Sequence, residues 1–288
     1  MASTLRMTTD QLLALCATLE RAPAVTRGFR PGRGVAAVRR ALAALARADG
    51  GTRAPAPARG RRRRGGPARM VAPAELTLAL FTEVCAHEPW DELPHHLLEP
   101  LFDATRVLAR LPPEPAPIEG GRVAENLLCV RRGDVTVRGD LEVRGGLVVT
   151  GSLRVSGAIR AYGEEWHSGT LVVLGDVQAA RMIQLGPAAI GGTLALRQGL
   201  ITAYYHDTDG GLVARRIEAP VWLDRGDITG RVRATRAIDH VLRFQSWLER
   251  RLPAYFEGES RKVAWHEFDA RFFRAAARAA QAERRRRR

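Results

Sequence analysis

One stretch of the sequence decides the fold, and it reads GDVTVRGDLEVRGGLVVTGSLRVSG from Gly133 to Gly157. Glycine recurs there at every sixth position, and the same spacing continues as far as Gly175. Counted from each glycine, the third and fifth positions are mostly apolar, beginning with Val135 and Val137. Residues two apart share one side of an extended chain, so each unit predicts a short strand with one apolar side. Glycine supplies the backbone freedom for a corner between units.

Strands this short cannot bury their apolar side alone, so successive units are expected to stack. Three units make a triangular coil of roughly 18 residues, and each coil lies about 4.8 Å from the last. Antiparallel hairpins are the alternative, because Arg138-Gly139-Asp140 would also suit a turn, but hairpin strands usually run about five or six residues. We therefore predict a mainly β protein in which residues 118–236 form a single-stranded parallel β-helix, or β-solenoid, with α-helices flanking it at both ends.

The repeat from Gly133 to Gly157 resembles that of the bactofilins, which are bacterial cytoskeletal proteins that form polymers. The resemblance covers the β-helix region only. It implies a right-handed β-helix that joins end to end into filaments without nucleotide, and it implies no catalytic residues. On this basis we expect a non-enzymatic structural or scaffold protein that self-associates through stacking of its coils.

The flanking regions differ from the repeat in composition and periodicity. We predict an N-terminal helical segment over residues 1–50, a helical block over residues 73–112 and C-terminal amphipathic helices over residues 237–283. Residues 51–72, rich in Arg, Pro and Gly, are expected to be a disordered linker, and residues 284–288 a poly-Arg tail. Repeat proteins generally require caps, so helices that cover the solenoid ends would give a second function, a soluble module that binds a protein partner.

Apolar spacing and capping residues place the individual helices. They are expected from about Thr8 to Arg21, from Val35 to Ala48, from Ala74 to Glu88 and from Leu97 to Leu111. After Arg236 the sequence predicts a helix with Val241, Phe244, Leu248 and Leu252 on one face, and Ser260 is expected to cap a last helix with Phe272 and Ala276 on its apolar face.

The formal net charge of +14 raises a third hypothesis, which is association with nucleic acid or an anionic membrane. Two runs of arginine are the candidate anion-binding tails, and they comprise Arg61, Arg62, Arg63, Arg64, Arg284, Arg285, Arg286, Arg287 and Arg288. Such runs are usually solvated, and no nucleic-acid recognition motif accompanies them.

Two similar insertions interrupt the repeat and predict longer loops at its corners. They supply a candidate interaction surface made of Trp166, His167, Tyr204, Tyr205, His206 and Asp207. Hexapeptide acyltransferases also have a six-residue repeat, and they use a histidine as general base. Their repeat places an aliphatic residue before the glycine position, where this chain has Arg132, Arg138 and Arg144. Phosphate-binding loops, dinucleotide fingerprints and HExxH are absent from the sequence. We therefore expect no enzyme activity, catalytic residue, cofactor, metal site or small-molecule substrate.

The cysteines and the apolar segments bear on location. Cys16, Cys85 and Cys129 are scattered and odd in number, which favours a reducing compartment over a disulfide framework. The apolar stretch around Leu12 to Leu15 is too short to span a membrane and is interrupted by charge. We expect a cytoplasmic protein whose partner is another copy of itself or a different protein.

Overall fold

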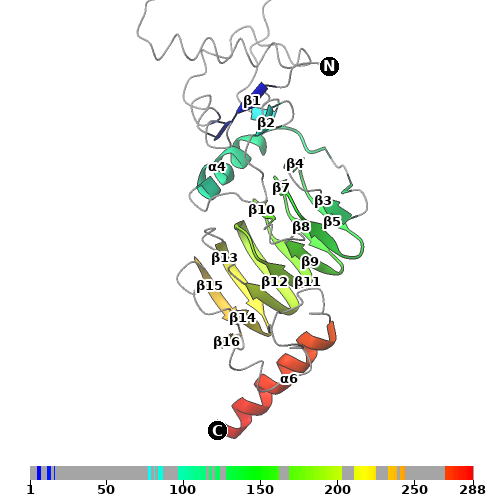
Figure 1. Ribbon diagram of the computed structural model, residues 1–288, viewed down its shortest axis with the longest axis vertical. Coiled ribbons are helices and arrows are strands. Elements are labelled where there is room, and N and C mark those ends of the chain that lie inside the picture. The colour runs from blue at the N-terminus through cyan, green and yellow to red at the C-terminus, as the bar shows by residue number, and fades with distance from the viewer. Residues whose placement is uncertain are drawn as a thin grey trace, which may run out of the picture.

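The computed structural model describes residues 5–7, 12–13, 16, 77–78, 81, 84–86, 97–114, 117–118, 121–123, 128–161, 169–202, 211–224, 233–238, 241–243 and 270–287. Most of these residues lie in one large sheet whose strands pair in parallel and wind around a common core, as Figure 1 shows. The protein is therefore mainly β, with the parallel, solenoid-like arrangement that the glycine repeat predicted. The antiparallel alternative is excluded for these strands.

The first coils follow the six-residue repeat closely. β3 (Arg122–Val123), β4 (Leu128–Arg131) and β5 (Val135–Val137) are followed by β6 (Leu141–Val143), β7 (Gly146–Val149), β8 (Leu153–Val155) and β9 (Ala158–Ala161). Each strand pairs with the third strand along the chain, so β4 pairs with β7, β5 with β8 and β6 with β9. Residues bonded between these coils are 18 positions apart, which is the predicted length of three repeats.

The later strands are β10 (Thr170–Val173), β11 (Val177–Gln184), β12 (Ala188–Thr202), β13 (Leu212–Ala219), β14 (Trp222–Asp224), β15 (Arg233–Ile238) and β16 (Val241–Arg243). Among the later strands, β11, β12, β13 and β15 are longer and turn a corner without ending. β12 alone pairs with β10, β11, β13 and β14. The coiled region thus continues to Arg243, past residue 236 where the sequence pattern placed its end. The segment expected to open a helix at residue 237 contributes instead to β15 and β16.

The coil has three faces, which we call the first, second and third face. The first face contains β4, β7, β10 and the starts of β12 and β13. The second contains β5, β8, the start of β11, the middle of β12 and the end of β13. The third contains β3, β6, β9, the ends of β11 and β12, β14 and β16.

The core is the interior of the coil. All of the apolar residues predicted to point inward are buried there, from Val135 and Val137 to Leu171 and Val173. In the later coils, Trp222 stacks beside Leu200 and is fully buried, and its indole N–H donates to the Thr202 hydroxyl at 2.7 Å. Hydrophobic burial of stacked side chains therefore holds the coils together, and the largest side chain has a partner for its polar atom.

The corners depend on glycine because successive coils come very close there. A Cβ atom on Gly157 would lie 2.6 Å from the carbonyl oxygen of Gly139 in the coil before it. Gly139 itself has a φ of 90°, which most residues avoid. Aspartates next to corner glycines accept hydrogen bonds from the following coil, each at 2.7 Å. Asp134 accepts from the Ser152 N–H, Asp140 from the Ala158 N–H and Asp176 from the Thr193 N–H. Sequence reasoning found the glycines but missed these aspartates.

Two helices lie against the sides of the coil. α4 (Leu98–Leu108) packs on β10 and β12, and it confirms the helix expected over residues 97–111. α6 (Ala270–Arg287) packs on β12, with Phe272 and Phe273 fully buried. Figure 1 shows α4 and α6 on opposite sides of the sheet. Both contact strands inside the stack, whereas the second hypothesis from the sequence places helices over its ends.

The N-terminal part differs from expectation in one place. β1 (Leu5–Met7) and β2 (Val84–Ala86) form a separate two-stranded parallel sheet, so Val84 to Ala86 are not helical as the apolar spacing over residues 74–88 suggested. Residues 77, 78 and 81 within that range are helical, as are residues 12, 13 and 16 within the expected first helix. A short apolar segment is ambiguous between helix and strand, and here pairing with a distant segment decided it.

Candidate interaction surfaces

The outward residues of the first face are apolar and largely covered. Aligned residues on five successive strands project outward there, namely Val130, Val148, Val172, Ala189 and Val213. Val148 and Val172 are fully buried although they point away from the core. α4 supplies this cover over β10 and β12, where it packs, and the Phe102 ring lies 3.1 Å from a Cβ built on Gly191. This face is an internal interface.

The third face is divided along the coil. In the early coils its outward residues are charged, and Glu142 pairs with Arg144 at 2.6 Å and with Arg122 at 3.6 Å. In the later coils Ile183 and Ile201 occupy the same outward row and are fully buried. α6 packs close by, since a Cβ on Gly199 would lie 2.5 Å from the Phe273 ring. The apolar half of this face is therefore also internal.

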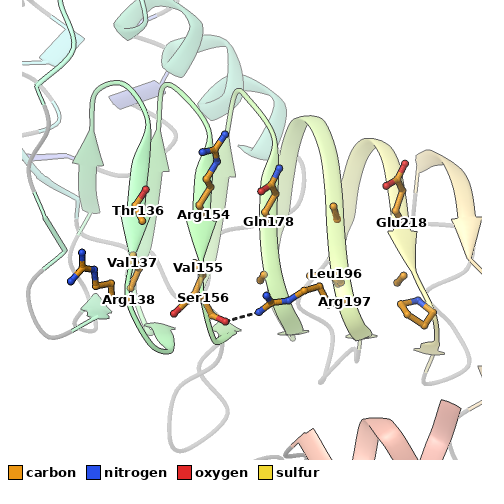
Figure 2. Close-up of a pocket in the computed structure, with 14 residues that line it drawn as sticks. Thr136, Val137, Arg138, Arg154, Val155, Ser156, Gln178, Leu196, Arg197 and Glu218 are labelled. Atoms are coloured by element: carbon orange, nitrogen blue, oxygen red, sulfur yellow. Dashed lines mark hydrogen bonds between the residues drawn. The ribbon is translucent and has the colours of Figure 1, made fainter. Parts of the chain in front are cut away.

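The second face is the open one. Its outward row is Thr136, Arg154, Gln178, Ala195 and Glu218, and the first three are exposed. A groove of about 590 Å³ crosses five strands of this face. Figure 2 shows Arg154 and Gln178 on the neighbouring strands β8 and β11 and Glu218 on β13, with their side-chain ends turned the same way. Arg197 lies across the strands and donates to the Ser156 carbonyl oxygen at 2.7 Å.

The charges along this groove are mainly positive. Arg138, Arg154 and Arg197 line it, and no carboxylate among the described residues pairs with any of them. Glu218 is the acidic residue of the lining, and Arg216 binds it at 2.7 Å. Ala179, Ala195 and Leu196 give the groove an apolar floor. This surface is not among the sites predicted from the sequence, although polar residues at alternate positions of β5, β8 and β11 indicate a solvent-exposed sheet face.

The N-terminal end of the coil is partly covered. β5 pairs with β8 on one side, and no described strand pairs with its other side. At the corner before β5 the preceding segment crosses the end, where the Glu114 N–H donates to the Arg132 carbonyl oxygen at 3.0 Å. Ile118 is buried with the core residues of the first coil. The corner is therefore covered while the edge of β5 on the second face lies open in the described part of the chain.

The C-terminal end has the same one-sided pairing. β15 pairs with β13 and β16 pairs with β14, and neither has a second neighbour among the described strands. Within the described part of the chain, β5, β15 and β16 therefore each have a strand partner on one side only. Such edges are templates for pairing with another chain.

The predicted corner-loop surface lies outside the described residues. Trp166, His167, Tyr204, Tyr205, His206 and Asp207 all belong to segments that the structure leaves undescribed, so this prediction stays open. Their flanks are described: Ala161 pairs with Gln184, and Gln184 pairs with Thr202. Both insertions therefore leave the coil at the same corner, between the third and first faces.

The structure describes most of one predicted arginine run and none of the other. Arg61 to Arg64 and Arg288 lie outside the described residues, whereas Arg284 to Arg287 belong to α6 and continue its helix. Earlier in α6, Arg274 and Arg278 are exposed, as is Arg285, and the spacing of 3.6 residues per turn places the three on one side of the helix. The buried phenylalanines occupy a different side, which leaves the arginine side available to an anion.

Burial changes the pKa of the two cysteine thiols that the structure describes. Burial raises the pKa of the Cys16 thiol to about 12, against a smaller lowering by its hydrogen bond to Thr77. Burial also raises the pKa of Cys129, with the Arg131 charge acting in the opposite direction. Within the described ranges, no three metal-ligating side chains converge, and no helix has the length and apolar character to cross a membrane.

Comparisons with protein-family models, with curated proteins and with solved structures found no match to this chain.

Proposed function

We propose that this chain is a non-enzymatic scaffold protein of the cytoplasm that self-associates by stacking its β-helix coils end to end, in the manner of the bactofilins. In this proposal the β-helix is right-handed, as in that family. The observation that carries the proposal is the pairing of the terminal strands, because β5 at one end and β15 and β16 at the other pair on one side only among the described residues.

The backbone of β5 indicates how a second copy would bind. The Val135 N–H donates to the Ser152 carbonyl oxygen at 2.8 Å, and the Val137 carbonyl oxygen accepts from the Ser156 N–H at 3.0 Å. Adjacent residues of a strand direct their backbone groups to opposite neighbours, so Thr136 directs its N–H and C=O away from β8. A strand from another copy, laid about 4.8 Å from β5, would pair with these groups.

The direction of the Thr136 N–H provides a selective test. Proline lacks this donor and is tolerated on an edge strand when the N–H faces solvent. Thr136→Pro should therefore leave the fold intact and reduce assembly, whereas Thr136→Val, which keeps the N–H, should assemble like the unmodified protein. Sedimentation velocity over a range of concentrations, with negative-stain microscopy of the full chain, measures both.

A soluble capped module that binds a protein partner is the second candidate. The segment that crosses the N-terminal corner, with Glu114 bonded to Arg132 and Ile118 packed against the core, favours it. If the unmodified protein remains monomeric at every concentration and Thr136→Pro changes nothing, the capped module replaces the scaffold.

Attachment of the scaffold to an anionic polymer is a further role that the exposed arginines of α6 support. Replacing Arg274, Arg278 and Arg285 by Gln should lower the salt concentration at which the protein elutes from heparin, because fewer counterions are displaced on binding. An unchanged elution would remove this role and leave the assembly hypothesis as it is.

A further inference from the structure

The groove on the second face has dimensions that select among partners. One row of its lining contains Arg154 and Gln178, and the other contains Ser156 and Arg197, two residues further along the strands. Two residues of a strand span about 7 Å, and four steps between five strands span about 19 Å. An α-helix with side chains is about 10–12 Å wide and would not enter between the rows. One extended chain of roughly six residues, with a rise of about 3.3 Å per residue, fits this length.

The charge of the groove selects the chemistry of that chain. Arg154 is exposed, and neither it nor Arg138 has a carboxylate partner among the described residues. The described contact of the Arg197 guanidinium is with a neutral carbonyl oxygen, that of Ser156. Guanidinium groups form their strongest hydrogen bonds with carboxylates and phosphates. The ligand is therefore expected to carry negative charge at several positions along its length.

The floor of the groove separates two kinds of acidic chain. Proteins that bind single-stranded nucleic acid combine basic residues with aromatic side chains on which the bases stack. The described lining contains no aromatic residue, and its floor is formed by small or aliphatic side chains such as Ala179, Ala195 and Leu196. Such a floor suits the small or aliphatic side chains of a peptide, which alternate with acidic ones in an extended conformation.

We infer that this groove binds an extended, acidic segment of a partner protein. Arg154 and Arg197 bind its carboxylates, and the floor around Ala195 contacts the intervening side chains. The site lies on the side of the coil and reaches its N-terminal end at β5, but Arg154 and Arg197 belong to later strands, so it functions in a single copy as well as in an assembly.

Fluorescence anisotropy with a labelled octapeptide of alternating Glu and Thr tests this inference on the full chain. The unmodified protein should bind the peptide, with an affinity that falls as salt is raised. Arg154→Glu should weaken binding at least about tenfold, because it replaces attraction by repulsion. Arg215→Glu is the matched control, since Arg215 is an exposed residue of β13 that does not line the groove, and it should change the affinity less than twofold.

A second variant tests the groove without changing its charge. Ala195→Tyr places a large ring in the row of Arg154 and Gln178, where it obstructs the groove, and should also weaken binding at least about tenfold, while thermal unfolding verifies that both variants fold. A matching octapeptide of Gln and Thr should bind weakly, and oligothymidylate of eight nucleotides should not compete. Equal loss in the Arg154 and Arg215 variants, unchanged binding in Ala195→Tyr, no binding of the acidic peptide, or preference for oligothymidylate would each overturn the inference.

Discussion

The first and second faces are built from the same coils and differ only in what they direct outward. Both place aligned valine, leucine and isoleucine side chains in the core, as at Leu147 on β7 and Leu153 on β8. On the first face the outward row is apolar and α4 packs over it, whereas on the second face the row is polar and open. The inward residues therefore form the coil, and the outward residues determine which neighbours each face accepts.

This difference has a functional consequence. A face that the chain itself covers cannot bind a partner, so the first face and the apolar half of the third face are excluded from recognition. The second face, the charged half of the third face and the coil ends remain. The second face and the ends suit different events. Among the described residues, the terminal strands β5, β15 and β16 keep one side without a strand partner, which suits pairing with another copy, while the second face offers arginine side chains and a shallow apolar floor.

Charge placed on the two faces should give the largest contrast in stability. Val172→Asp would bury a carboxylate beneath α4, and an uncompensated buried charge costs about 3–5 kcal/mol. Gln178→Asp places the same carboxylate in the outward row of the second face and should change the unfolding free energy by less than about 0.5 kcal/mol. Urea unfolding followed by circular dichroism measures both. Similar midpoints for the two variants would show that the first face is not covered in solution.

The attachment of α6 should give the next largest effect. Phe273→Ala removes a fully buried ring next to Gly199, and such truncations cost about 3 kcal/mol. Because α6 packs on one side of the coil, the loss should appear as faster hydrogen exchange in α6 while the strands keep their protection. Arg274→Ala, on the exposed side of the same helix, is the control. Equal exchange in the two variants would contradict the packing of α6 on β12.

The corner aspartates should have a smaller effect. Asp176 accepts a hydrogen bond from the Thr193 N–H at 2.7 Å, and Asp176→Ala should lower the unfolding free energy by about 1 kcal/mol. Asp176→Asn keeps an acceptor oxygen and should recover most of this loss. Chemical denaturation measures the three proteins under the same conditions. If Asn proves as destabilising as Ala, the carboxylate stabilises the corner through its charge instead of this bond.

The smallest effect concerns the reactivity of the cysteine thiols and not the stability of the protein at neutral pH. The labelling rate should distinguish the buried Cys16 from the half-buried Cys129. With its pKa raised from 9.0 to about 12, the Cys16 thiol should react with iodoacetamide at pH 8 roughly 1,000-fold more slowly than an ordinary thiol. Because the folded protein holds the Cys16 proton more tightly than the unfolded chain does, the protonated thiol contributes fully to the unfolding free energy below pH 9. This contribution is lost as pH rises through about 12. Mass spectrometry after timed labelling compares Cys16 with the half-buried Cys129. Faster labelling of Cys16 would contradict its burial.

The coil was predictable because its signals are local. Gly139, Gly145, Gly151 and Gly157 are spaced at the length of one side of the triangle, and the inward valines and leucines alternate within each unit. The end of the coil was missed for the same reason. Val241 fits a helical spacing with later residues, but it lies in β16 because Trp222 in the previous coil offers it an edge to pair with.

The open groove was less accessible from sequence. Arg154 is recognisable as an outward residue, but Arg197 lies two coils further along the stack, and only the stacking of β8, β11 and β12 brings its side chain to Ser156. The same applies to Val148 and Val172, which in the sequence look like residues of a strand buried on both sides without any indication of what covers them.

By itself, the sequence determined that the middle of this protein winds into parallel coils around an apolar core, because a repeated six-residue pattern sets both the alternation of side chains and the positions of the corners. The tertiary structure alone decided which faces remain available. α4 and α6 are far in sequence from the strands they cover, and their packing depends on apolar surfaces that exist only after the coils have stacked.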